Sequence, residues 1–161
     1  MTAASEAFWR FSLALYARPG VADALIGLQD RAGRDVNLLL YALWLGVRGV
    51  RLDTPALAAA TAAIGPIDTG VVAPLRRLRR KLRGTGDPQL AGLRRRILGL
   101  ELAGERSVQN CLEALPAPVD PGLAAGGVDL AGANLALSLG GAHREAESVV
   151  LLDALRRLTH R

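Results

Sequence analysis

The most distinctive hydrophobic pattern in the chain is the run over residues 35–45, D-V-N-L-L-L-Y-A-L-W-L, which starts polar and then has no polar face. A surface helix shows one apolar stripe, whereas a helix that is apolar all round is buried on every side. The run therefore predicts the central, buried helix of a helical domain. Asp35 stands where the N-cap of that helix would be.

Further helices follow from the caps, prolines and glycines that punctuate the chain. We expect them over residues 5–17, 21–31, 53–65, 68–84, 87–115, 129–139 and 143–158, with one helix ending at Gly65-Pro66 and the next opening at Asp68 or Thr69. No segment alternates with the period of a strand. The pattern predicts a single all-α domain, a bundle of about seven or eight helices around residues 35–45.

This bundle divides into three parts along the chain. We expect a helical core over residues 1–115, which includes a basic helical hairpin at 69–115. Residues 116–127 are rich in Pro, Gly and Ala and predict a loop. Residues 128–161 would then form C-terminal helices that pack on the core.

Composition and length narrow the class of protein. Half of the 161 residues are apolar, so disorder of the whole chain is not expected, and the single Cys111 excludes an internal disulfide framework. The longest fully apolar run, residues 38–47, is too short for a bilayer, which needs about 20 residues. We therefore expect no transmembrane segment and a cytoplasmic protein.

The net charge of +5 comes from one region. Residues 76–96 carry +8 and the rest of the chain −3. The candidate anion-binding residues are Arg76, Arg77, Arg79, Arg80, Lys81, Arg83, Arg94, Arg95 and Arg96. A short connection at residues 84–88 predicts that the two helices bearing them pack antiparallel. The cluster would bind an acidic protein or another polyanion, or it is a solvated face neutralised by Glu101, Glu105, Glu113, Glu145 and Glu147.

A second cluster is polar and surrounds Gly33: Gln29, Asp30, Asp35 and Asn37. Its carboxylates could serve a ligand site beside an interior lined by aromatic residues, all of which lie within residues 8–44. Alternatively, Asp35 caps the buried helix while Asp30 and Asn37 bond to backbone groups of the turn.

Motifs for catalysis, cofactors and metals are not found. No complete nucleophile elbow, dinucleotide fingerprint or phosphate loop occurs, and His143 and His160 have no partner at metal-ligand spacing. We expect no cofactor. No aromatic residue interleaves the arginines, so nucleic-acid binding, although possible by charge, has no motif to support it.

Two stretches carry a resemblance: F-W-R-F-S-L-A-L-Y at residues 8–16, and L-Q-D-R-A-G-R-D-V-N-L-L-L-Y-A-L-W-L at residues 28–45. The chain resembles a proteobacterial family of uncharacterised proteins of about this length. The similarity is dense over residues 8–50 and, past Pro116, rests on Asn134-Leu135-Ala136-Leu137. The resemblance implies a helical domain and no particular activity.

These observations favour a non-catalytic interaction or adaptor module whose basic hairpin docks an anionic partner. An enzyme or small-ligand carrier that uses the cluster at Gln29–Asn37 is the alternative, and sequence-independent nucleic-acid binding is a second one. A polar cavity that reaches Asp30 or Asp35 would favour the ligand site, and a closed core under Trp44 would favour the module.

Overall fold

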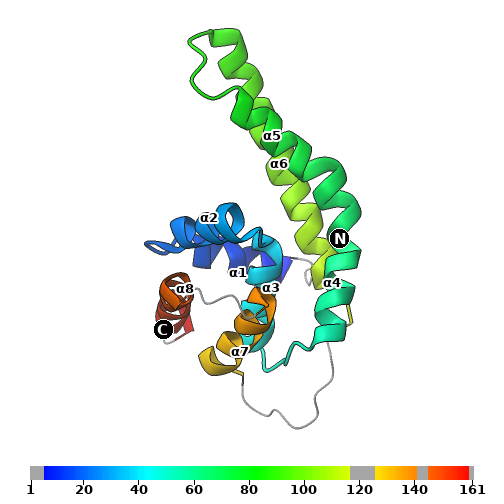
Figure 1. The fold of residues 1–161 in the computed structure, drawn as a ribbon, viewed down its shortest axis with the longest axis vertical. Helices are drawn as coiled ribbons and strands as arrows, with labels where there is room; N and C mark the ends of the chain where they lie inside the picture. The colour runs from blue at the N-terminus through cyan, green and yellow to red at the C-terminus, as the bar shows by residue number, and fades with distance from the viewer. Residues whose placement is uncertain (1–5, 117–125, 141–144, 160–161) are drawn as a thin grey trace.

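The computed structural model describes residues 6–116, 126–140 and 145–159, and these residues form helices and no strand. Because α4, η2 and α5 form one continuous helix, the described part of the chain has seven continuous helices, which confirms the predicted all-α fold. Figure 1 shows a compact body of α1, α2, α3, α7 and α8, from which α5 and α6 project. The elements are α1 (Ala7–Tyr16), α2 (Val21–Ala32), α3 (Val36–Val47), α4 (Thr54–Ile67), the π-helical η2 (Asp68–Val72), α5 (Ala73–Lys81), α6 (Pro88–Glu113), α7 (Val128–Leu139) and α8 (Glu145–Thr159).

Helix α3 is the buried centre of the body, as the apolar run predicts. Asp35 caps it by accepting a hydrogen bond from the Leu38 N–H at 3.0 Å, and every residue from Leu39 to Gly46 is buried. Helix α7 crosses α3 at Gly46, where an added Cβ would lie 2.3 Å from the Ala131 Cα. The missing side chain therefore allows the two backbones to approach this closely.

The Asn134 side chain links α7 by hydrogen bonds to α3 and to the segment that follows α3. Its side chain is 1% exposed, and its Nδ2 donates to the carbonyls of Ala42 (3.2 Å) and Val50 (2.9 Å), while its Oδ1 accepts from the Leu52 N–H (2.9 Å). A buried amide of this kind is stable only when its donors and acceptor find partners. Asn134 thus bonds to one carbonyl within α3 and to two backbone groups of the segment that follows α3.

The prediction that a helix ends at Gly65-Pro66 and another opens at Asp68 or Thr69 is wrong. The helix runs through Pro66, whose missing N–H costs one hydrogen bond, and continues into η2, a wider turn in which the Ala73 N–H bonds to the Asp68 carbonyl five residues back. A π-helical turn inserts an extra residue into the helix, and here it also precedes the second proline, Pro74.

The resulting helix, Thr54–Lys81, is 28 residues long with a mean hydropathy of 1.5 over its most apolar window, so it is long and apolar enough to cross a membrane by length and composition. This is weak support for a membrane span. Asp68 interrupts the apolar part, and a charge at that depth of a bilayer is costly. The helix also packs on α6 and α3. The described residues therefore contain no clear transmembrane segment.

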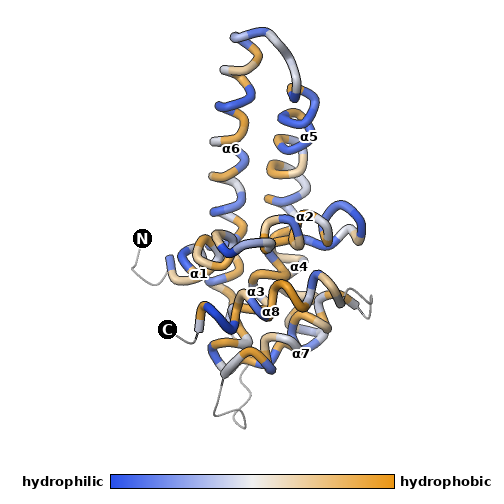
Figure 2. The backbone as a smooth tube through the Cα atoms, turned by 90° about the vertical axis from the view of Figure 1, so that its left-hand side faces the viewer, coloured by the Kyte–Doolittle hydropathy of each residue, from blue (hydrophilic) through white to orange (hydrophobic). Residues whose placement is uncertain are grey.

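Helices α5 and α6 form an antiparallel hairpin that extends away from the body (Figures 1 and 2). Asp87 caps α6 by accepting from the Gln89 N–H at 2.8 Å. At the base of the hairpin, a Cβ on Gly104 would lie 2.9 Å from the Val72 side chain, so α6 packs closely against η2. Hydrophilic and hydrophobic residues alternate along both helices of the hairpin in Figure 2.

Candidate functional site

A half-open cleft of about 820 Å³ lies between the body and the hairpin. Helices α1, α2 and α3 form one wall, and α5 and α6 form the other. Its apolar lining includes Leu13, Tyr16, Ile26, Leu98 and Leu102, all of them more than a third exposed. The volume is in the range of pockets that hold small organic ligands.

The cleft brings together residues from the two clusters that the sequence singles out. From the polar cluster, Gln29, Asp30 and Asn37 line it, whereas Asp35 lies at the N-cap of α3 and is not part of the lining. From the basic cluster, the lining residues are Arg76, Arg79, Arg80 and Arg83. The remaining basic candidates, Arg77, Lys81, Arg94, Arg95 and Arg96, do not line the cleft.

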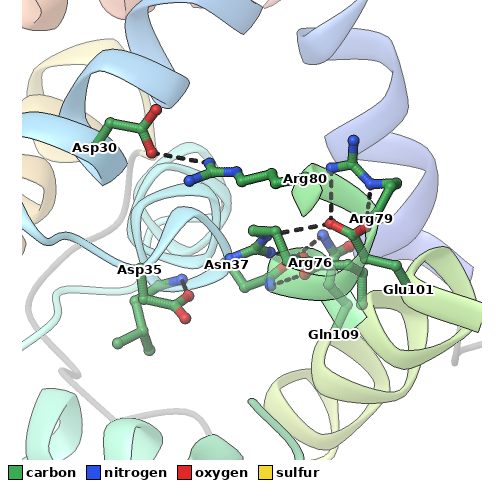
Figure 3. Close-up of polar contacts among 10 residues, drawn as sticks. Asp30, Asp35, Asn37, Arg76, Arg79, Arg80, Glu101 and Gln109 are labelled. Atoms are coloured by element: carbon green, nitrogen blue, oxygen red, sulfur yellow. Dashed lines mark hydrogen bonds and ion pairs between the residues drawn. The ribbon is translucent and has the colours of Figure 1, made fainter. Parts of the chain in front are cut away.

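A chain of polar contacts runs across the floor of the cleft (Figure 3). Arg79 and Arg76 both bind Glu101, with Arg76 Nε at 3.2 Å from Glu101 Oε1, and Arg76 also binds Glu105. Asn37 Nδ2 donates to Glu105, and Gln109 Nε2 donates to Asn37 Oδ1 at 2.9 Å. These polar contacts join α5, α6 and α3.

Burial and neighbouring charges shift the pKa values of three residues that line the cleft, Glu101, Arg79 and Tyr16. Burial alone raises the pKa of Glu101, but the hydrogen bonds and charges of Arg79 and Arg76 outweigh it and hold that pKa below the ordinary value of 4.5. The hydrogen bond from Arg79 to Glu101 in turn raises the pKa of Arg79. Burial, with the charge of Glu105, raises the pKa of Tyr16 at the cleft wall. Glu101 is therefore an ion-paired carboxylate, not a proton donor, near neutral pH.

Arg80 bridges the two walls by an ion pair with Asp30 at 3.0 Å, in which both side chains are 46% exposed. An exposed pair of this kind contributes little to stability. It does place a cation and a carboxylate at the rim of the cleft.

The capping interpretation of the polar cluster holds for Asp35 and is wrong for two of its neighbours. Asp30 and Asn37 bond to side chains of the hairpin, not to the backbone of the turn. Burial raises the pKa of Asp35 from 3.8 to about 6, against the lowering effect of the Leu38 N–H, and the charges of Asp68 and Glu105 raise it further.

The aromatic residues also separate into two groups. The rings of Phe8, Tyr41 and Trp44 lie 5.1 to 6.0 Å apart in the core, and Trp44 is only 6% exposed. Trp9 and Tyr16 line the cleft instead. The core under Trp44 is thus closed, while a cleft with a mixed polar and apolar lining reaches Asp30.

Glu101, Glu105 and Gln109 are cleft residues that the sequence interpretation did not assign to a site. It considered the two glutamates only as neutralising charges. Their spacing of four residues places all three on one face of α6, and this signal could have found them.

Residues 7–112 match the model of a family described as "Protein of unknown function (DUF2390)". The chain belongs to this family. No curated protein and no solved structure shows a significant match. The DUF2390 match covers every residue that lines the cleft and leaves α7 and α8 outside.

Proposed function

We propose that this DUF2390 protein is a non-catalytic interaction module whose hairpin binds an acidic, amphipathic segment of a partner protein. The observation that carries the proposal is the combination of unpaired cations and exposed leucines on the hairpin. Within the described chain, six of the nine basic candidates form no ion pair: Arg77, Lys81, Arg83, Arg94, Arg95 and Arg96.

The binding surface is the side of the hairpin that faces away from the cleft, here called the outer flank: Leu78, Lys81, Leu93, Arg96 and Leu100. Leu93, Arg96 and Leu100 share one face of α6 by their spacing, and Leu78 and Lys81 are similarly placed on α5. The three leucines are 46%, 45% and 58% exposed, in chain order.

Charge and chemistry favour a protein as the partner. Protein interfaces have an apolar centre and are enriched in Arg, whereas a nucleic-acid backbone would leave the leucines in water. A second copy of the chain seated on the same flank would bring Lys81 and Arg96 against like charges. An acidic amphipathic helix satisfies both the cations and the leucines.

A defined probe tests the proposal: a synthetic helical peptide with leucines on one face and glutamates beside them. We expect saturable, stoichiometric binding that weakens with added salt. The double variant K81E/R96E should bind at least about tenfold more weakly. The control R10E/R157E changes two exposed arginines that form no ion pair in the described structure, so it has the same net charge but should bind like wild type.

Other outcomes would overturn the proposal. Equal weakening by both double variants would mean that only net charge matters. Preference for duplex DNA, with a steep salt dependence and no base preference, would favour the nucleic-acid alternative. A dimer of wild type that K81E/R96E leaves intact or strengthens, with no peptide binding, would mean that the flank serves self-association.

The small-ligand alternative has an observation of its own, because the cleft reaches Asp30 and Asn37. This cleft lies on the other side of the hairpin from the outer flank. The two sites can therefore exist together and can be tested separately.

A further inference from the structure

The floor of the cleft contains two buried polar atoms that no described group satisfies. Ser12 Oγ and Gln109 Oε1 have no hydrogen-bond partner, and both side chains line the cleft while being only 4% exposed. Buried polar atoms are nearly always paired, and an unpaired one destabilises the fold. A ligand that bonds to both atoms would remove this deficit.

The neighbouring contacts determine which chemistry Gln109 offers. Glu105 accepts hydrogen bonds through its two carboxylate oxygens, from Arg76 at one and from the Asn37 amide nitrogen at the other. Asn37 Oδ1 then accepts from Gln109 Nε2 at 2.9 Å. The free atom of Gln109 is consequently its oxygen, which requires a donor. A ligand hydroxyl can donate to this oxygen and can also accept from Ser12.

One of the four arginines that line the cleft has no carboxylate partner among the described residues. Arg76, Arg79 and Arg80 are paired with Glu101, Glu105 and Asp30. Arg83 lines the cleft and forms no ion pair among the described residues. It lies seven residues beyond Arg76 on the hairpin, roughly 10 Å along a helix axis. An anionic group of a ligand would therefore lie at the rim, away from the floor.

We propose that the cleft binds an organic acid with an apolar body, its carboxylate at Arg83 and a hydroxyl at the other end on Ser12 and Gln109. The exposed side chains of Leu13, Ile26 and Leu102 would cover the apolar body. This site does not depend on the proposed protein partner, because it uses none of the residues of the outer flank.

Three probes of equal length test the proposal by titration calorimetry: ω-hydroxyoctanoate, octanoate and the α,ω-octanediol. We expect the hydroxy acid to bind about tenfold more tightly than either probe that lacks one end group. Ser12→Ala should remove the advantage of the hydroxyl but melt at or above the wild-type temperature. The control Ser107→Ala, whose exposed hydroxyl bonds within its own helix, should change neither.

The anionic end is tested with Arg83→Gln, which should weaken both acids and leave the diol unchanged. Arg77→Gln, on the same hairpin but outside the cleft, should leave all three affinities at wild-type values. Equal affinity for hydroxy acid and octanoate, or wild-type affinity of the Ser12→Ala variant, would overturn the proposal. So would the absence of binding by all three probes.

Discussion

Gln109 Nε2 donates a hydrogen bond to Asn37 Oδ1 at 2.9 Å, and both side chains are only 4% exposed. The bond joins the hairpin helix α6 to the buried helix α3. Because Asn37 also donates to Glu105, the direction in which the hairpin leaves the body is tied to the core. The position of the cleft and of the outer flank depends on this junction.

Replacement of Asn37 by alanine is expected to destabilise the protein. The change leaves the Gln109 amide without its acceptor and Glu105 without one donor, and buried groups left unpaired cost about 2–4 kcal/mol together. Chemical denaturation measures the loss. Gln89→Ala, at an exposed position of the same hairpin, should stay within about 0.5 kcal/mol of wild type. Equal stability of both variants would contradict the structural role of the junction.

Glu101→Gln should lower stability by about 2–4 kcal/mol at neutral pH, because it leaves Arg76 and Arg79 without their shared carboxylate. The pKa of Glu101 is lowered in the folded state, so its contribution is present above the unfolded value of 4.5 and is lost as the pH falls through the folded value. The difference between wild type and variant should therefore shrink below pH 4.5 in denaturation curves. A difference that is constant with pH would contradict the ion pairing.

Asp35 should show the opposite pH dependence. Its pKa rises from 3.8 to about 6 on folding, so the folded state favours the protonated form and the penalty for ionisation grows as the pH rises between these values. Asp35→Asn retains a capping oxygen and removes the charge. It should be more stable than wild type at pH 7, by on the order of 1–3 kcal/mol, with the gain fading toward pH 4.

The control for this prediction is Asp35→Ala, which removes the cap together with the charge. It should be less stable than Asp35→Asn by about 1 kcal/mol at every pH. An asparagine variant that is less stable than wild type at pH 7 would show that the carboxylate does more than cap the helix.

Local patterns predicted much of the fold because they depend on neighbouring residues. The absence of a polar face over residues 39–46 identified the buried helix. Asp35, Asp53 and Asp87 were found by their positions, and each caps the helix that follows. The break at Gly65-Pro66 was predicted wrongly, because a proline disfavours a helix without excluding one, and here α4 continues through Pro66 into η2.

The candidate site was less predictable because its contacts connect distant parts of the chain. The charge pattern identified the basic residues, but only the fold shows that Arg76 meets Glu105 and that Asn37, 68 positions earlier than Glu105, meets the same carboxylate. It also shows which cations stay unpaired. That distinction separates the cleft from the outer flank.

A charge-swap titration tests the central claim, that the outer flank binds an acidic amphipathic partner. The affinities of wild type and K81E/R96E are measured for the leucine–glutamate peptide and for its twin with lysines in place of the glutamates. We predict that wild type binds the acidic peptide and that K81E/R96E binds the basic one, each at least about tenfold more tightly than the mismatched pair. If K81E/R96E binds the acidic peptide as well as wild type does, the outer flank is not the binding surface.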